Sequence, residues 1–277
     1  MKDEPFEQMG RWLQLTSWEN KFPLLRARFS TRLHGESKQP YDTLNTGLHV
    51  GDEPSDVLKN RAYLAEDIQI PLAQWVAPEQ VHGNQIQVVN RSQRGQGAKD
   101  IENACGKADG LITNDEGLLL TAVYADCVPI WFVDPSTGWI GLAHAGWKGT
   151  AANIVNEMIY HLKAQGININ SLQAAIGPSI GKTNYEVDER VYNEIVNLQL
   201  PQVELDEAID YAGEGSYRID LKRVNEALLR AEGVKSTHIL KSEYCTYDHS
   251  SLFYSHRRDG LESGRMLAGI GWVENET

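Results

Sequence analysis

The sequence predicts an α/β or α+β protein in which helices pack on mixed β-sheets in layers. Short apolar runs typical of strands outnumber the helical patterns, and many follow one another too closely for a helix to lie between them. Hydrophobic residues make up 41% of the 277 residues, enough to bury a sizeable core. Because no Ser/Pro-rich linker and no fixed-period repeat divides the chain, we expect one domain over residues 1–277, with residues 1–25 as an N-terminal extension or an edge element.

Runs of β-branched and apolar residues between turn-forming residues predict the strands. In chain order they cover residues 26–30, 86–90, 110–113, 118–123, 129–133, 139–143, 172–176, 238–240 and 266–273. The most polar stretch, residues 90–107, predicts a long loop inserted within the domain, and loops of that length are usually functional or mobile.

Helical periodicity with start and stop signals predicts the helices. They cover residues 56–67 after the Pro54-Ser55 cap, 150–165 ending at Gly166, 188–198 stopping before Pro201, and 221–231 ending at Gly233.

The charge balance narrows the class of ligand. Acidic residues outnumber basic residues by 38 to 26, which gives a formal charge of −12. A duplex nucleic acid or an anionic lipid surface is repelled by such a chain unless basic residues gather locally, and here they are scattered. We therefore expect no nucleic acid and no membrane as a partner, and a small molecule as the ligand. The sequence gives no oligomeric state.

Cysteine usage and the N-terminal residues indicate the compartment. Cys105, Cys127 and Cys245 are too few and too widely spaced for a disulfide framework. The first residues carry acids and lack the apolar core of a secretory signal. The longest uncharged apolar stretch, residues 117–125, is much shorter than the roughly 20 residues that cross a bilayer. We therefore expect a cytoplasmic protein.

The most informative segment is residues 118–150, in which two apolar strands each end in polar residues. Cys127 follows Asp126 at the end of the first strand, and His144 follows the second strand and opens a loop of small residues. His82 lies in a turn ahead of the strand at 86–90. One thiolate and two imidazoles form a plausible zinc site, and three protein ligands leave the fourth position for water or substrate, as in catalytic sites.

The same side chains admit other interpretations. Cysteine with two histidines is also a copper ligand set, but no methionine follows Cys127 closely and the eight histidines form no His-x-His pair, which disfavours copper. In a metal-free alternative, Cys127 is a nucleophile, His144 its base and Asp126 the acid that orients the base. In the zinc interpretation, Asp126 orients a ligating histidine or moves a proton. A buried cysteine and hydrogen-bonded core histidines without catalytic roles are the plainest alternative.

Positive groups for an anionic substrate are expected in three places. The free N–H groups of the helix predicted at 150–165, with Lys148 beside them, favour an anion. A group of arginines lies within residues 257–265, and another arginine follows the first strand. From these places we expect substrate or phosphate to be bound by Arg32, Asn45, Lys148, Arg257 and Arg258.

Taken together, the motifs resemble the YfiH family, also called the laccase-domain or multicopper polyphenol oxidase family, which is now regarded as a family of purine nucleoside phosphorylases. The resembling segments lie in order between about residues 28 and 272: 30–32 (STR), 41–52 (YDTLNTGLHVGD), 79–83 (EQVHG), 108–113 (ADGLIT), 125–130 (ADCVPI), 144–150 (HAGWKGT), 175–180 (AIGPSI), 185–187 (YEV) and 255–260 (SHRRDG).

The resemblance implies a catalytic zinc bound by His82, Cys127 and His144. It implies phosphorolysis of adenosine, inosine, guanosine or methylthioadenosine to free base and ribose 1-phosphate, with adenosine deamination as a side activity. It also implies a single layered domain related to cytotoxic necrotizing factor-like toxins, and some members are linked to peptidoglycan. The chain departs from the family pattern at Lys148 (usually Arg), at Tyr124 (usually Thr) and at 33–36, where LHGE replaces a Gly-Gly-Val-Ser-like turn.

Four hypotheses of function follow. The first is a zinc-dependent purine nucleoside phosphorylase. The second is a metal-free Cys-His hydrolase that acts on an amide or a peptidoglycan precursor. The third is a copper polyphenol oxidase, and the fourth is a purine-binding module with a vestigial site.

Overall fold

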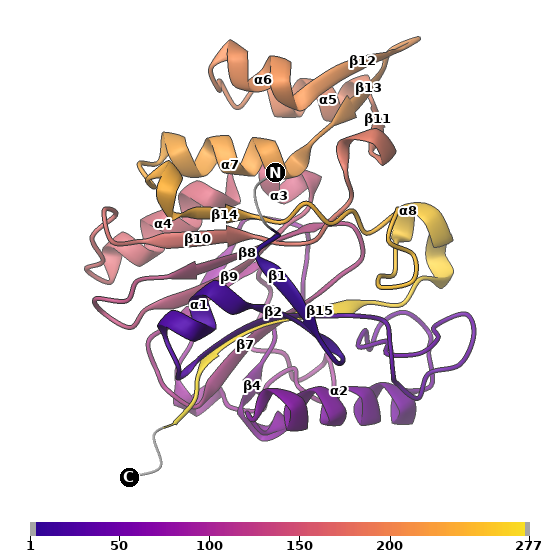
Figure 1. Cartoon of the computed structure of the whole chain (residues 1–277), viewed down its shortest axis with the longest axis vertical. Coiled ribbons are helices and arrows are strands. Elements are labelled where there is room, and N and C mark those ends of the chain that lie inside the picture. Colours follow the sequence, from indigo (N-terminus) through magenta and orange to yellow (C-terminus); the bar gives the residue numbers. More distant parts are fainter. Residues whose placement is uncertain (1–3, 275–277) are drawn as a thin grey trace.

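The computed structural model describes residues 4–274, and two six-stranded sheets form its centre (Figure 1). The strand order of the first sheet is β1 (Phe6–Met9), β2 (Trp12–Leu15), β3 (Leu25–Ser30), β15 (Met266–Trp272), β7 (Leu118–Tyr124) and β4 (Trp75–Val76). Neighbours are antiparallel except for the parallel pair β4 and β7. The N-terminal strands β1 and β2 thus form one edge, while β15 lies in the middle.

The second sheet is also mixed. Its order is β14 (Ile239–Lys241), β10 (Gln173–Ile176), β8 (Val128–Val133), β9 (Ile140–Ala145), β6 (Gly110–Thr113) and β5 (Ile86–Val88). The outer pairs β10–β14 and β5–β6 are parallel, and the inner pairs are antiparallel. The predicted mixed α+β class is therefore confirmed.

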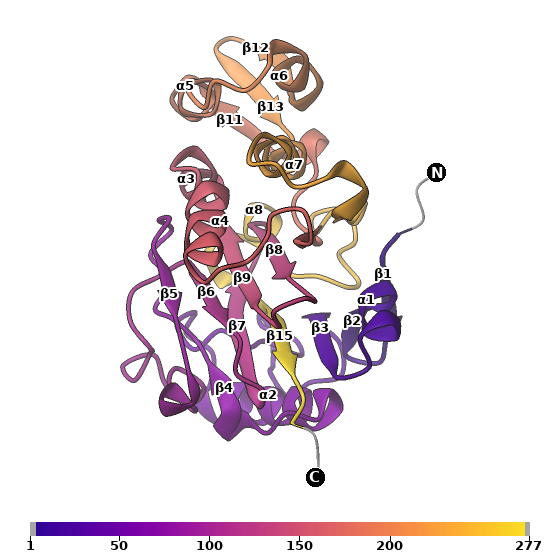
Figure 2. The same cartoon turned by 90° about the vertical axis from the view of Figure 1, so that its left-hand side faces the viewer.

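The molecule is layered, with the two sheets packed face to face and helices on both outer faces. Strands β7 and β15 pack against β9, and a core of buried aromatic and branched side chains that includes Phe29, Tyr124 and Trp131 lies between the sheets. Helix α2 (Pro54–Ile68) covers the outer face of the first sheet through Leu64 and Ile68. Figures 1 and 2 show α2 on one side and the helices α4 (Ile154–Ala164) and α7 (Leu221–Ala231) on the other.

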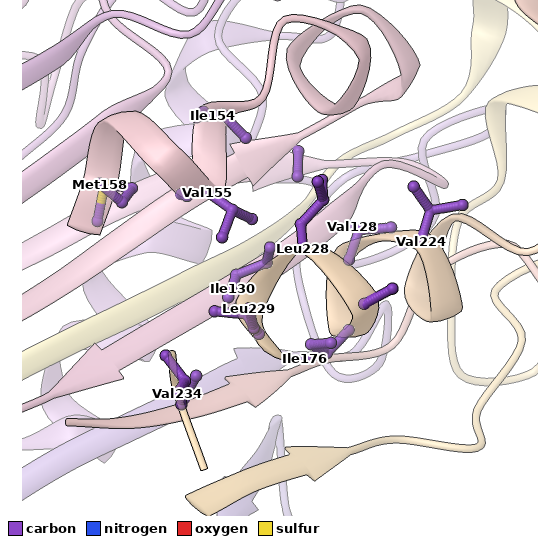
Figure 3. Packing of buried hydrophobic residues seen from close by; sticks show 14 of the residues in the cluster. Val128, Ile130, Ile154, Val155, Met158, Ile176, Val224, Leu228, Leu229 and Val234 are labelled. Carbon is purple, nitrogen blue, oxygen red and sulfur yellow. The ribbon is translucent and has the colours of Figure 1, made fainter. Parts of the chain in front are cut away.

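Helix α7 illustrates how sequence pattern becomes packing. Its apolar residues recur at helical spacing, and the Asp220 carboxylate caps its first turn by accepting the N–H of Arg223 at 3.0 Å. The apolar stripe, with Val224 and Leu228, faces the second sheet (Figure 3). Helix α7 thus covers the outer face of the second sheet, the face that points away from the first sheet.

A small third sheet and several short helices complete the fold. The sheet has the order β11 (Glu186–Asp188), β13 (Ser216–Ile219) and β12 (Ile209–Gly213), all antiparallel. The short helices are α1 (Thr16–Lys21), α3 (Trp147–Ala151), α5 (Glu189–Val196), α6 (Gln202–Ala208) and α8 (His256–Asp259). The sequence did not predict the third sheet, because its strands are short and largely exposed and so lack a period-2 apolar pattern.

Each strand expected from the sequence is present, with bounds that differ by at most two residues. Residues 90–107 form the predicted loop, built from turns and one short 3₁₀ helix, Arg91–Gln93. The single helix predicted at 150–165 is wrong: α3 ends at Ala151, and α4 starts only at Ile154. Asn153 separates them because it adopts a left-handed conformation (φ 53°), and its side chain caps α4 by accepting the N–H of Asn156.

Within residues 4–274, no helix combines the length and the apolar character needed to cross a membrane. The likeness to cytotoxic necrotizing factor-like toxins stays a prediction.

Candidate metal centre

Three ligand-bearing side chains converge where the second sheet meets two loops. His82 lies in the turn between β4 and β5, Cys127 between β7 and β8, and His144 in β9. Their ligand atoms all lie within 4.8 Å of one another, and in the described part of the chain they are the one such group of His, Cys, Asp and Glu side chains. The residues predicted from the sequence as metal ligands are thus brought together.

Strand pairing explains how residues far apart in sequence meet here. Strands β8 and β9 are antiparallel, and Val128 pairs with Ala145, so Cys127 lies next to the end of β9 that carries His144. The loop after β9 must also leave room, because a Cβ atom at Gly146 would lie 3.0 Å from the Cys127 Sγ. A glycine at position 146 therefore keeps the space around the thiol open.

Asp109 orders the two histidines. Its buried carboxylate accepts the backbone N–H groups of Val81, His82 and Gly83 at 3.2, 3.0 and 2.7 Å. The same carboxylate lies 2.8 Å from the Nδ1 of His144. The turn that carries His82 is held in a left-handed conformation (φ 59°) by these bonds. With Nδ1 of His144 engaged, Nε2 is the nitrogen left to ligate a metal, and this is the usual outer-shell arrangement of a metal-bound histidine.

The electrostatics favour a thiolate among cationic or donor groups. Burial by itself raises the pKa of the Cys127 thiol, but the imidazoles of His144 and His82 outweigh this effect and lower that pKa to about 6. Burial would lower the pKa of His144, yet the Cys127 thiolate and Asp109 raise it to about 9. A Cys thiolate with two histidine nitrogens suits Zn²⁺ or copper, so the donor set fits a metal ion.

Asp126 has partners other than the histidines. It takes a left-handed conformation (φ 81°), and its carboxylate accepts the hydroxyls of Thr246 and Ser255 at 2.6 and 3.0 Å. It also accepts the backbone N–H of Arg257 at 2.7 Å. The prediction that Asp126 orients a histidine is corrected, because Asp109 makes that contact and Asp126 fastens the segment before α8 to the site.

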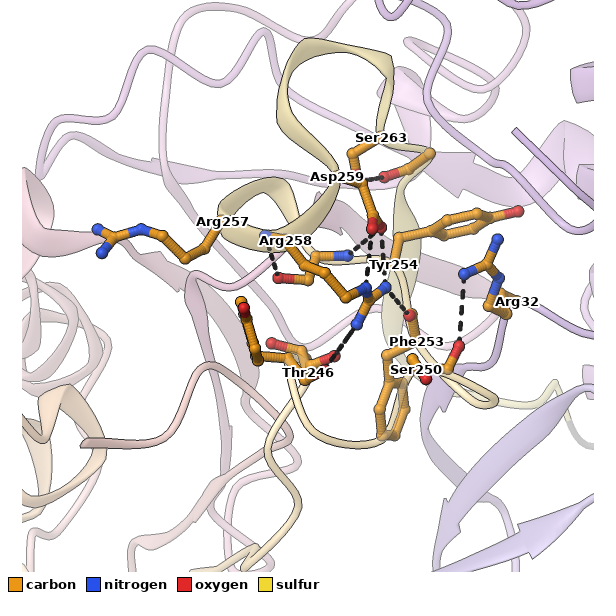
Figure 4. A network of polar contacts seen from close by, with 12 residues as sticks. Arg32, Thr246, Ser250, Phe253, Tyr254, Arg257, Arg258, Asp259 and Ser263 are labelled. Carbon is orange, nitrogen blue, oxygen red and sulfur yellow. Dashed lines mark hydrogen bonds and ion pairs between the residues drawn. The ribbon is translucent and has the colours of Figure 1, made fainter. Parts of the chain in front are cut away.

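Two of the arginines predicted to bind phosphate are engaged elsewhere (Figure 4). Arg258 forms a two-pronged ion pair with Asp259, at 2.7 and 2.8 Å, and donates to three backbone carbonyls. Arg32 donates twice to the carbonyl of Asp42 and stacks on the ring of Tyr254. With their donors committed and neither side chain lining a cavity at the trio, the structure does not bring Arg32 and Arg258 to the centre.

The other three predicted binding residues have different surroundings. Arg257 points away from the network of Figure 4, stacks on Tyr185 and donates to the carbonyl of Glu186 at 2.7 Å. Lys148 is exposed on α3, with its Nζ 5.7 Å from the centre of the Trp147 ring, and lines neither cavity at the trio. Asn45 is fully buried and bonds the backbone of its own loop. Of the three, only Arg257 faces a cavity at the trio.

Two cavities adjoin the trio and share part of its surface. The first has a volume of about 560 Å³ and the second about 420 Å³. His82, Cys127, Ala125 and His256 line both. The walls that they do not share differ in chemistry, and the contrasting residues are Arg61 and Arg265 in the first cavity and Trp147, Tyr185, Asp188 and Arg257 in the second.

Sequence reasoning missed Asp109 and Arg61 as site residues, and it placed Arg265 only within the group of arginines at 257–265 without singling it out. Asp109 lies within the ADGLIT segment and Arg265 follows the SHRRDG segment, so proximity to resembling motifs was the signal available for both. Arg61 has no such signal, since it sits in α2 among ordinary charged residues.

Stacked mixed sheets with helices on both faces and a Cys-His-His centre beside two cavities define the class of this molecule as an α+β protein with a candidate metal site in an enzyme-like pocket. The chain belongs to the family described as multi-copper polyphenol oxidoreductase laccase, whose model matches residues 26–273.

Relatives of known name support this membership. The chain is 46% identical to the purine nucleoside phosphorylase YlmD of Geobacillus stearothermophilus over 91% of each chain, and 41% identical to that of Bacillus subtilis over 95% of this chain and 93% of the relative. The crystal structure of the G. stearothermophilus YlmD superposes with a TM-score of 0.92 at 44% identity, covering 98% of this chain and 100% of that one. The Bacillus licheniformis hypothetical protein YfiH gives a TM-score of 0.93 at 39% identity, covering 98% and 99%.

Proposed function

We propose that this protein is a zinc-dependent purine nucleoside phosphorylase that converts a purine nucleoside and phosphate into free base and ribose 1-phosphate. The observation that carries the proposal is the placement of the His82–Cys127–His144 trio beside two cavities, with His82 and Cys127 on the wall that both cavities share and His144 on the wall of the first. Phosphorolysis joins two reactants at one carbon atom, and two cavities that meet at one reactive surface suit such a reaction. The names of the relatives support the same activity.

The chemistry needs little covalent participation from the protein. An oxygen of hydrogen phosphate forms a bond to C1′ of the ribose while the bond from C1′ to the purine nitrogen breaks. The electron pair of that bond leaves with the base, and the proton of hydrogen phosphate ends on the base. Attack from the face opposite the leaving base requires phosphate and purine on opposite sides of the ribose, which matches one reactant in each cavity.

The residues of the chain then have distinct tasks. His82, Cys127 and His144 would hold the metal, and the chemistry that it would supply there is Lewis-acid polarisation of an oxygen of substrate or phosphate. Asp109 fixes the ring of His144 and the turn of His82. Trp147 and Tyr185 line the second cavity, and such an aromatic wall would suit a purine.

The decisive experiment assays the as-purified protein with adenosine, with and without phosphate, and measures zinc and copper on the same sample. Free adenine that depends on phosphate, with about one zinc per chain, supports the proposal. His82→Ala and Cys127→Ala should abolish it, whereas the matched changes His161→Ala and Cys105→Ala, at residues that are outside the trio and line neither cavity, should not. If His82→Ala and Cys127→Ala still release free base, the assignment of the trio as the metal site is refuted. If the protein contains copper in place of zinc, the polyphenol oxidase hypothesis is favoured.

Adenosine deamination is the expected side activity, because a metal held by His82, Cys127 and His144 would supply Lewis-acid chemistry for hydrolysis beside a bound purine. Inosine formed from adenosine in the phosphate-free samples of the same assay tests it. The absence of inosine would remove the side activity and leave phosphorolysis untouched.

A second candidate function rests on a specific geometry. A Cys-His hydrolase uses a nucleophile, a base and an acid that orients the base. Here these would be Cys127, His144 and Asp109, with Nδ1 of His144 2.8 Å from the Asp109 carboxylate. A hydrolase that acts on an amide or a peptidoglycan precursor would keep its activity in a chelator and lose it with a thiol alkylator. The phosphorylase would lose activity in the chelator and regain it with added zinc.

A further inference from the structure

Arg61 and Arg265 are arginines of the first cavity that lack an acidic partner. Within residues 4–274, neither forms an ion pair. Arg61 is only 4% exposed and lines the first cavity, so its small accessible surface opens there. Burial lowers the pKa of Arg61 to about 10, which still leaves it cationic at neutral pH. Buried charges normally have a partner of opposite charge, so two arginines without an acidic partner beside a cavity need an explanation.

Their hydrogen bonds position both guanidinium groups without neutralising them. Arg61 donates Nε to the carbonyl of Thr46 and Nη1 to the carbonyls of Gly97 and Ala98, at 2.8–3.0 Å. Arg265 donates Nη1 to the carbonyls of Ser263 and Gly264 at 2.6 and 3.0 Å. Within the described residues, Nη2 of neither arginine has a protein partner. Each therefore keeps a free donor edge for a ligand.

One loop holds both arginines. The Thr46 carbonyl accepts Arg61, while the Thr46 N–H and hydroxyl both donate to the Arg265 carbonyl at 3.0 and 2.8 Å. The buried Asn45 accepts the backbone N–H of Arg265 at 2.8 Å. A Cβ atom at Gly47 would lie 2.7 Å from the Cγ of Arg265, so the glycine makes room for that side chain. This is the structural use of the TLNTG sequence within the 41–52 motif.

The charges around the two cavities differ in sign. The acid that lines the first cavity, Glu79, lies 3.8 Å from the ammonium of Lys107, which offsets it. The second cavity is lined by Asp126, Glu186 and Asp188 against the single cation Arg257. In a chain of net charge −12, an anion is attracted to the first cavity and repelled by the second.

We propose that Arg61 and Arg265 form the subsite for the phosphate co-substrate in the first cavity, a proposal that rests on the phosphorylase function above. Free guanidinium donors suit the oxygens of a phosphate, and both arginines are held on the cavity wall that adjoins the trio. The purine is then left to the second cavity. Asn45 and Thr46 are positioning residues that act through the two arginines.

The test compares Arg265→Gln with Arg91→Gln, which removes an exposed arginine paired with Glu274 away from both cavities. In steady-state assays with purified, metal-loaded protein, Arg265→Gln should raise the KM for phosphate about tenfold or more and change the KM for adenosine by less than about twofold. Arg265→Lys should recover part of the loss because it keeps the charge. Arg91→Gln should match wild type. A change confined to the KM for adenosine would overturn the proposal.

Calorimetric titration with inorganic phosphate separates this proposal from the proposed function. If wild type binds phosphate, if Arg265→Gln and Arg61→Lys weaken that binding, and if the protein shows no turnover, the anion subsite is supported and the phosphorylase function is refuted. Equal phosphate affinity in wild type and Arg265→Gln would overturn the subsite even in an active enzyme. Wild type that binds no phosphate, with or without adenosine, would also overturn it.

Discussion

Two buried aspartates adjoin the ligand trio, and a comparison of their partners shows how the site is built. Asp109 binds the turn of His82 and the ring of His144, so it acts on the ligands themselves. Asp126 is next to Cys127 in sequence, yet it binds Thr246, Ser255 and the backbone of Arg257. Proximity in sequence to a ligand therefore did not identify the residue that orients the ligands. Asp109 therefore sets the geometry of the ligands. Asp126 instead holds residues 246–257, which come late in the chain, beside the centre.

The largest expected difference is in the reactivity of two thiols, Cys127 in the trio and Cys245 near the partners of Asp126. In chelator-treated protein, Cys127 should react with iodoacetamide at pH 7 at least about 100-fold faster than Cys245, because Cys127 lines two cavities and the histidines lower its pKa to about 6. Cys245, on the Asp126 side, is buried and accepts the N–H of Gly181. Since the thiolate is present above pH 6 and is lost as pH falls through that value, the rate should drop between pH 7 and pH 5. Peptide mass spectrometry gives the rates, and equal labelling of both thiols would refute this contrast.

Asp109→Asn should strike the ligand side. The change removes the negative charge that holds His144, and second-shell losses of this kind typically cost about 10–100-fold in metal affinity. Competition with a chromophoric zinc chelator measures the affinity. Wild-type affinity in Asp109→Asn would show that the carboxylate is not needed to position the histidine.

Asp126→Asn should strike folding and spare the metal. Asparagine tolerates the left-handed conformation of position 126, but it loses charge-assisted bonds to three donors, which costs about 1–3 kcal/mol of unfolding free energy. Denaturant unfolding measures the loss, and zinc competition should give an affinity within about threefold of wild type. If the zinc affinity fell as far as in Asp109→Asn, the two aspartates would have the same role.

Lys148→Ala should have the smallest effect. The Lys148 ammonium is exposed and lines neither cavity, so kcat/KM should stay within about twofold of wild type, as for an ordinary surface substitution. A large rise in the KM for phosphate would instead restore Lys148 to the anion subsite.

The sequence predicted the ligand trio because each member ends or precedes a strand beside small residues and lies within a motif that resembles the family. It did not predict Asp109 as the orienting acid, because that role depends on the pairing of Gly110 with Ala143, which brings the start of β6 beside His144. Arg61 was equally hidden. Its helix carries charged residues on its exposed face, and only the tertiary fold shows that this one arginine is buried. Their charge and the motifs around them predicted Arg32 and Arg258 as phosphate-binding residues, but the tertiary fold decides their intramolecular partners, and the sequence alone does not show them.

The central position of β15 has a consequence for synthesis. All three ligands have left the ribosome well before Met266, yet β3 and β7 have no partner strand between them until β15 is made. The groups that bind Asp126 are also late, since they lie at 246, 255 and 257. The nascent chain thus carries a thiol and two imidazoles for a long interval before the fold that arranges them can close. A metal ion that loads the folded site, rather than the growing chain, must arrive after β15 has been translated.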